Sequence, residues 1–354
     1  MKNIFLIILS LSFIYAEINI SGDARIRPRL DIIDIPSENK SNDIYYLYRA
    51  RLNIKTNIGD GYFLNLKLGT NDLSSISKMA NEDENFTDIP SSSSNLNAKR
   101  PKLHFLEIYY GYKKEQSGLW AGAFPIKHNP ALDLHYYSDK LVDIPWALYN
   151  NASITGVAGF RQFNKYIINW LFSIDNDNLN YSEIYSPAPL ANIKEESSDT
   201  YTFGLNSTFS IGPLNINPYL LYTFADESED APMTFGSKIK LKPIAGISSS
   251  ASYYISSNSN TNKYVANHLR LQIATKLGKG KIDLFYDIAS KTPEDTYQID
   301  KTFIWLSYSY TIYKSNFGSL GIKPTIRIQN NSSSEPQDEY KRTKLELTTE
   351  FKFK

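Results

Sequence analysis

Charged and apolar residues alternate one by one near the start of the chain. In the stretch INISGDARIRPRL, residues 18–30, Arg25, Arg27 and Arg29 are separated by alanine, isoleucine and proline. A period of two is the period of a β-strand, because successive side chains point to opposite faces. One face of this strand is therefore cationic and the other is apolar. In a soluble sheet the apolar face points to a core, whereas in a membrane barrel it points to lipid and the charged face to water.

Similar alternation recurs along the chain, most clearly in residues 44–58 (IYYLYRARLNIKTNI), 61–71 (GYFLNLKLGTN) and 341–354 (KRTKLELTTEFKFK). The pattern predicts about sixteen strands of roughly 9–15 residues, which is long for a soluble sheet and suits tilted membrane strands. Residues 242–260 are weakly patterned, so fourteen and eighteen strands are alternatives. Three prolines fall inside predicted strands, where each removes a ladder hydrogen bond. Bulges are one way to accommodate these prolines, which are Pro28, Pro218 and Pro324, and they leave the same alternatives of strand number open.

Short and long connections alternate strictly between the predicted strands. Short turns are predicted at 58–61, 114–118, 164, 212–213, 242–243, 279–280 and 316–318. The long polar stretches are 34–43, 71–101, 126–149, 178–198, 226–232, 256–262, 290–300 and 330–339. Transmembrane β-barrels have short turns at one end and long loops at the other. The sequence therefore predicts an all-β protein that forms an antiparallel transmembrane β-barrel.

The first sixteen residues differ from the rest of the chain. A positive Lys2 precedes a mostly apolar run, 4–15, and Ala16 is a small residue at a plausible cleavage point. This run is shorter than the about 20 residues that span a bilayer, so it predicts an export signal rather than a transmembrane helix. We expect residues 1–16 to be a signal peptide and 17–354 to be the barrel. No later stretch is apolar enough for a membrane helix, and the absence of cysteine excludes disulfides and thiolate metal sites.

With the faces assigned, the inward side chains include many cations. The predicted basic pore wall comprises Arg25, Arg27, Arg29, Arg49, Arg51, Lys55, Lys67, Arg270 and Arg327. Further inward cations are Lys238, Lys240, Lys276, Lys323 and Lys344, and the predicted inward acids are Asp23, Glu107, Asp175, Asp283, Asp287, Glu346 and Glu350. A lumen with excess positive charge concentrates anions, because its low-dielectric walls focus the field. The alternative is that every barrel wall carries mixed charges and that the balance has little meaning for transport.

One long connection carries the residue types of a pore constriction. The stretch 125–146, PIKHNPALDLHYYSDKLVDIPW, contains acids and histidines among apolar residues, namely Asp133, Asp139, Asp143, His128 and His135. Folded into the lumen, these acids would oppose the arginines and create a transverse field. An ordinary surface loop is the alternative. The acids of the other long stretches have no regular ligand spacing, so no metal site is predicted.

Sequence motifs of common enzyme classes are absent. The chain has neither an H-E-x-x-H pair, nor a G-x-S-x-G elbow, nor a phosphate-binding glycine loop. Two of its four histidines, His104 and His268, are predicted on the lipid face and the lumen face. The sequence therefore predicts a protein that is not an enzyme and needs no cofactor. A net charge of +1 also argues against a general nucleic-acid binder.

Three segments together resemble the porins of Gram-negative outer membranes, and are most similar to Campylobacter-type porins. They are EINISGDARIRPRLDI, YYLYRARLNIKTNIGDGYFLNLKLGTN, and GLWAGAFPIKHNPAL followed by DIPW. The resemblance implies passive diffusion of ions and small hydrophilic solutes through a homotrimer in outer-membrane lipid. The chain departs from such barrels at its end, where Lys354 follows the aromatic Phe353. Two other functions remain alternatives: a specific channel for phosphate or a sugar acid, and an adhesion barrel that uses residues 71–101 and 178–198.

Overall fold

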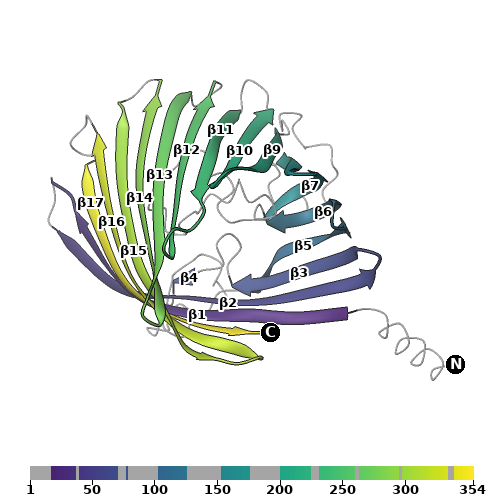
Figure 1. Ribbon diagram of the computed structural model, residues 1–354. Coiled ribbons are helices and arrows are strands. Elements are labelled where there is room, and N and C mark those ends of the chain that lie inside the picture. Colours follow the sequence, from purple (N-terminus) through teal and green to yellow (C-terminus); the bar gives the residue numbers. More distant parts are fainter. Residues whose placement is uncertain are drawn as a thin grey trace, which may run out of the picture.

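The computed structural model describes residues 17–36, 40–70, 77–78, 103–125, 153–175, 200–224, 231–259, 263–294, 297–333 and 339–354. Among these residues, no helix is long and apolar enough to cross a membrane. Sixteen long strands form the wall (Figure 1): β1 (Glu17–Asp34), β2 (Ser41–Gly59), β3 (Tyr62–Thr70), β5 (Leu103–Lys113), β6 (Ser117–Pro125), β7 (Ser153–Phe163), β8 (Tyr166–Asp175), β9 (Thr200–Ile211), β10 (Leu214–Phe224), β11 (Pro232–Leu241), β12 (Ile247–Asn258), β13 (Tyr264–Leu277), β14 (Gly280–Pro293), β15 (Ile299–Lys314), β16 (Gly318–Ser333) and β17 (Tyr340–Phe353).

Each long strand pairs antiparallel with the next one along the chain, and β1 pairs with both β2 and β17. The sheet is thus a closed sixteen-stranded antiparallel barrel, as the alternation predicts. The contact of β1 with β17 is the seam that joins the two ends of the chain. Gly22 lies opposite Phe353 in this seam, so the start of β1 and the end of β17 lie at the same rim. Closure leaves the barrel without an unpaired sheet edge.

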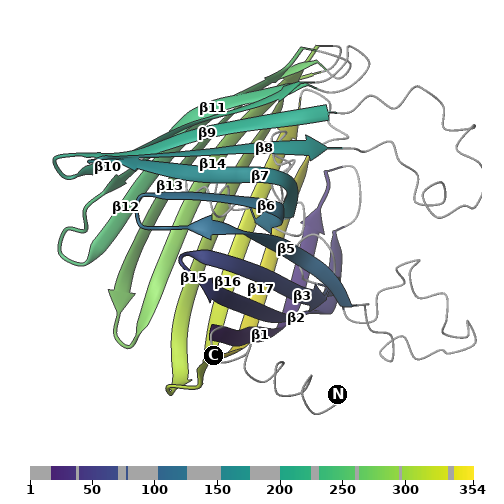
Figure 2. The same ribbon diagram turned by 90° about the vertical axis from the view of Figure 1, so that its right-hand side faces the viewer.

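The connections follow the predicted alternation of short and long links except around β12, where the link 242–246 is as long as the link 259–263. All seven short turns occur where the sequence places them, and they lie at one end of the barrel (Figure 2). Local chemistry explains several of them: Asp60, Asn164 and Gly212 have positive φ angles of 51°, 46° and 57°, which suit these residue types. One segment adds to the prediction. The two-residue strand β4 (Ser77–Lys78) lies within the predicted connection 71–101 and pairs with β2.

The two faces of the wall differ as the period of two requires. Outward side chains are large, apolar and exposed, as at Ile26, Tyr46 and Tyr110, of which 50%, 51% and 63% is exposed. Inward side chains crowd together on the concave face and are more buried. Many of the buried side chains are charged, for example Arg29 with 2% exposed and Lys344 with 0%. The barrel therefore has apolar side chains outside and charged side chains inside, which is the reverse of a soluble protein.

The three strand prolines are accommodated without bulges. The registers of β1, β10 and β16 run past Pro28, Pro218 and Pro324 without a shift. In the seam, the ladder pairs Ile26 with Thr349 and resumes at Arg29 with Glu346. The intervening positions of β1 make no ladder pair with β17. A proline without an N–H group leaves such a gap without changing the strand register.

The composition of the inner face changes around the barrel. Strands β5 to β8 contribute a packed aromatic and aliphatic cluster that includes Tyr109, Trp120, Phe124 and Leu171, each at most 5% exposed. The rings of Tyr109 and Phe124, and of Trp120 and Phe124, meet edge to face with centroids 6.4 and 6.5 Å apart. Strands β1, β2, β16 and β17 carry most of the buried charged groups, and we call this part of the wall the charged half. The charged half is the candidate site.

Candidate functional site

The acid Asp23 of β1 binds two arginines of the neighbouring strand β2. Its Oδ2 accepts hydrogen bonds from Arg49 Nε and Nη2 at 2.9 and 2.6 Å. Its Oδ1 accepts one from Arg51 Nε at 2.7 Å. The register explains the contact, because Asp23 lies directly opposite Arg51. A single carboxylate therefore holds two predicted pore-wall arginines side by side.

The strand β17 supplies two more acids from the other side of the seam. Glu346 forms an ion pair with Arg29, a second with Arg327 at 2.9 Å, and a longer contact with Arg27 at 3.8 Å. The Glu346 side chain is 1% exposed. A buried charge in such surroundings is tolerated only when it is paired and hydrogen-bonded. Glu346 is therefore the common anchor of arginines from β1 and β16.

Glu350, which lies four residues further along β17 toward the short-turn rim, is shared in the same way. It pairs with Arg25, with Lys352 at 2.8 Å and, more distantly, with Arg49 at 3.7 Å. At the opposite side of the network, Asp31 accepts two hydrogen bonds from Arg342, at 2.8 and 2.7 Å, and one from the hydroxyl of Tyr45 at 3.0 Å.

These contacts form three neighbouring groups of ion pairs on four strands, around Asp23 and Glu350, around Glu346 and around Asp31, and we call them together the arginine network. It comprises Asp23, Arg25, Arg27, Arg29, Asp31, Arg49, Arg51, Arg327, Arg342, Lys344, Glu346 and Glu350. The sequence places most of these residues on one face but does not pair them. Cations outnumber carboxylates in the network, yet each acid is bound to at least two of them. This part of the wall thus consists of ion pairs with an excess of positive charge, and it is not a patch of unpaired cations.

The remaining predicted cations lie elsewhere on the wall. Lys67 of β3 pairs with Glu107 of β5. Arg270 of β13 donates to both oxygens of Asp287, at 2.6 and 2.8 Å, as a planar guanidinium does with a carboxylate. Lys55 is exposed near the short-turn end of β2. These three cations do not join the arginine network.

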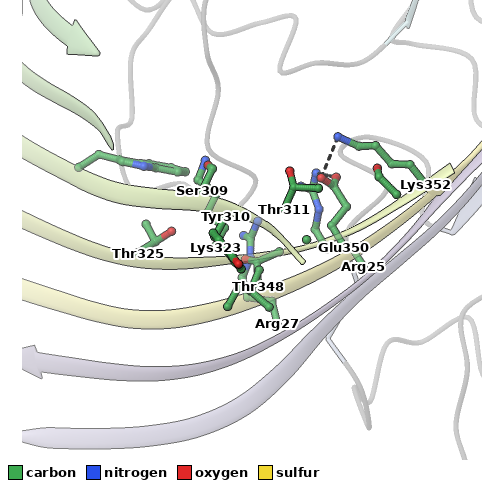
Figure 3. Close-up of a pocket in the computed structure, with 14 residues that line it drawn as sticks. Arg25, Arg27, Ser309, Tyr310, Thr311, Lys323, Thr325, Thr348, Glu350 and Lys352 are labelled. Carbon is green, nitrogen blue, oxygen red and sulfur yellow. Dashed lines mark hydrogen bonds and ion pairs between the residues drawn. The ribbon is translucent and has the colours of Figure 1, made fainter. Parts of the chain in front are cut away.

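A cavity of about 400 Å³ opens on the charged half of the wall, between β15, β16, β17 and β1 (Figure 3). We call it the seam cavity. Its lining residues are Arg25, Arg27, Trp305, Ser309, Tyr310, Thr311, Ser319, Gly321, Ile322, Lys323, Thr325, Thr348, Glu350 and Lys352. The volume falls within the range of small-molecule sites. Figure 3 shows Glu350 between Arg25 and Lys352, with dashed lines marking both ion pairs.

An aromatic ring organises the cations beside this cavity. The ring of Trp305 lies 4.1 Å from the guanidinium carbon of Arg327 and 5.2 Å from the Lys323 ammonium. These separations are those of cation–π contacts. Sequence reasoning missed Trp305, because its partners are set by the register of β15 on β16 rather than by a local motif. It also missed Asp31, although Asp31 has the same strand parity as the three arginines of β1.

One histidine prediction is wrong. His104 was expected on the outer face, but it lies opposite Gly69, on the side of the wall that carries Arg51. A bulge at Leu106 causes the change, since it inserts one residue into the alternation of β5. His268 lies on the inner face as predicted, 3.4 Å from Asp287.

The predicted constriction residues lie outside the described residues. They are Asp133, Asp139, Asp143, His128 and His135, so the fold of 125–146 into the lumen stays a prediction. Within the described ranges, no group of three or more histidine, aspartate or glutamate side chains is arranged to hold a metal ion.

Comparisons with known proteins place this geometry among outer-membrane barrels. No family model matches the chain, and no curated protein matches it significantly. Several solved structures do match over almost their whole length. OmpT of Vibrio cholerae, described as a trimer form, has a TM-score of 0.58 at 10% identity and covers 96% of this chain and 99% of its own. OmpF of Salmonella typhi, in complex with daunomycin, has a TM-score of 0.59 at 10% identity, covering 95% and 98%. An anion-selective porin from Comamonas acidovorans has a TM-score of 0.55 at 11% identity, covering 96% and 100%. The chain therefore shares the barrel fold of these proteins.

Proposed function

We propose that the protein is an outer-membrane porin that forms a water-filled channel for passive diffusion of ions and small hydrophilic solutes. The observation that carries the proposal is the closed sixteen-stranded barrel with an apolar outer face and a charged inner face. Barrels of 16–18 strands leave room for an aqueous channel. The function needs neither a catalytic step nor a cofactor.

The distribution of charge supports a preference for anions. In the arginine network the cations outnumber the carboxylates, so a net positive charge lines one side of the lumen. Charge rings and charged walls select counter-ions in pores. A similar structure is described as an anion-selective porin. We propose the same direction of selectivity for this chain, with Arg25, Arg27, Arg29, Arg49, Arg51, Lys55, Lys67, Arg270 and Arg327 as the basic wall.

The proposed location follows from the same features. The outer face would contact lipid, the short-turn rim would face the periplasm, and residues 1–16 would be removed as a signal peptide during export. One similar structure is described as a trimer form, and we propose a homotrimer here. We also propose Campylobacter-type porins as the group to which this chain is related.

The test is a recording of single channels formed by the purified barrel in a planar bilayer under a KCl gradient. We expect a large single-channel conductance that rises in proportion to the salt concentration. The reversal potential should have the sign of the chloride equilibrium potential. A correctly folded barrel that stays silent would refute the channel. A reversal potential on the potassium side would refute the anion preference alone.

A charge-reversal variant tests whether the basic wall sets the anion preference. Changing Arg25 and Arg51 to Glu should shift the reversal potential toward potassium, because both side chains line the interior and are about one fifth exposed. The matched control changes Lys114 and Lys165 to Glu, which makes the same change of charge at two exposed turns. An equal shift in the control would show that surface charge, rather than the wall, sets the selectivity.

A further inference from the structure

The seam cavity holds more positive charge than its one acid can cancel. Four cationic side chains line it, Arg25, Arg27, Lys323 and Lys352, against the single carboxylate of Glu350. Glu350 pairs with two of these cations and also lies 3.7 Å from an arginine of β2 outside the cavity. Because one negative charge is shared among three cations, the cavity remains cationic.

The other two cations make their closest contacts with neutral groups. Arg27 Nε donates to the hydroxyl of Thr348 at 2.9 Å. Its nearest acid is Glu346, at 3.8 Å, and that carboxylate is already bound by Arg29 and Arg327. A hydroxyl fixes the position of a guanidinium without cancelling its charge.

Lys323 is positioned in the same manner by an aromatic ring. Its ammonium lies 5.2 Å from the ring centroid of Trp305. Within the described part of the chain, no carboxylate lies within ion-pair distance of it. An indole ring attracts a cation through its quadrupole and carries no net charge itself. The ammonium is thus held toward the cavity with its charge available to a ligand.

Hydroxyl groups complete the lining. Ser309, Thr311, Ser319, Thr325 and Thr348 surround the cations, and a hydroxyl can donate a hydrogen bond to an anionic oxygen. A phosphate group has several acceptor oxygens and about −1.5 to −2 charges at pH 7. It can therefore accept bonds from cations and hydroxyls at once, whereas a single carboxylate offers only one charge and two oxygens. Cationic donors bind such oxyanions with short, charge-assisted hydrogen bonds.

We propose that the seam cavity is a binding site for a phosphate group, carried by inorganic phosphate or by a small phosphate ester. This inference rests on the proposed channel function and names a solute class for it. Phosphate held on the wall narrows the path for smaller ions while it is bound. The channel current carried by chloride should then fall as phosphate is added, and the fall should saturate.

The experiment measures the chloride current of the purified barrel in planar bilayers at fixed KCl. Inorganic phosphate, glycerol phosphate or acetate is added in increasing concentration at constant ionic strength. Partial block that saturates with phosphate and not with acetate is expected. Block by inorganic phosphate alone would assign the site to the free ion, and block by both phosphates would extend it to esters.

Matched variants locate the effect. Lys323→Gln should raise the half-blocking phosphate concentration about tenfold, equivalent to about 1.4 kcal/mol of binding free energy. Lys240→Gln removes one exposed lysine from β11, away from the cavity, and should leave the value unchanged within twofold. Calorimetric titration of the detergent-solubilised wild-type barrel with phosphate gives a second measurement that does not depend on the variants inserting.

The two proposals fail in different ways. A folded barrel without any current refutes the channel. A conducting barrel in which phosphate acts no more strongly than acetate refutes the seam cavity as a phosphate site. Equal loss of block in Lys323→Gln and Lys240→Gln also refutes it, since the effect would then follow total lumen charge.

Discussion

Glu346 offers the most direct test of whether the arginine network stabilises the barrel. Glu346→Gln keeps the size of the side chain and an acceptor oxygen but removes the negative charge. Arg29 and Arg327 then lose an ion pair each, and Arg27 loses a contact at 3.8 Å. These side chains are at most 9% exposed, so little water can replace the lost charge.

The magnitude follows from the geometry. Two unit charges 4 Å apart interact by about 4 kcal/mol at an effective dielectric constant of 20. Part of this is recovered by the remaining amide and by relaxation of the arginines. Removing one partner of a buried pair costs about 3–5 kcal/mol, and we expect the free energy of unfolding to fall by about this amount.

The assay is urea-induced unfolding of the barrel in lipid vesicles, followed by tryptophan fluorescence and by the gel mobility of the folded form. The matched control is Glu294→Gln, which breaks an exposed pair with Lys263 whose side chains are 54% and 50% exposed. Exposed pairs contribute about 0–1 kcal/mol. If both variants lose the same stability, the network does not hold the wall together and the reasoning fails.

Three further predictions concern the outer face, the selectivity and the backbone. Leu66→Arg places a charge on the outer face and should destabilise the barrel in vesicles by about 2–4 kcal/mol if it lies near the bilayer midplane, whereas Lys67→Arg on the inner face should change little. Asp23→Asn releases the two arginines of β2 that it binds and should move the reversal potential further toward chloride in a KCl gradient. Gly122→Ala should lower the free energy of unfolding by about 1–3 kcal/mol, because Gly122 has φ of 120° and its added methyl group would meet backbone atoms of β5. The same change at Gly212, which is in open space, should cost less.

Each of these has a result that contradicts it. Equal losses at Leu66 and Lys67 would mean that the faces are assigned wrongly. An unchanged reversal potential in Asp23→Asn would show that the charge of the arginines is cancelled by other groups. A stable Gly122→Ala variant would indicate that β5 and β6 separate easily at this point.

Much of the fold could be predicted because its causes are local. The alternation in residues 24–29 assigns the faces of β1, and Asn164 and Gly212 mark turns by their own backbone preferences. The prediction for His104 failed because a bulge is a property of two strands. The same holds for Pro28, where the neighbouring strand tolerates a gap in the ladder.

The site was less predictable for the same reason. Parity places Arg29 and Glu346 on the inner face, but only the closure of β1 on β17 brings them into contact across 317 residues of sequence. The position of Lys323 over Trp305 depends on a pairing between two other strands. Residue types and their faces follow from sequence, whereas partners follow from register.

The gap in the seam ladder has a consequence for how this protein can vary. Where β1 and β17 lack backbone pairs beside Pro28, the side chains of Arg27 and Thr348 bridge the strands at 2.9 Å. The ion pairs from Arg25 and Arg29 flank this bridge. The first and last strands are thus held together by groups that belong to the basic wall of the proposed channel. If the proposed channel is correct, a mutation of these groups that changes selectivity also weakens the closure of the barrel, so changes of selectivity should be tolerated more readily at Lys67 or Arg270, far from the seam.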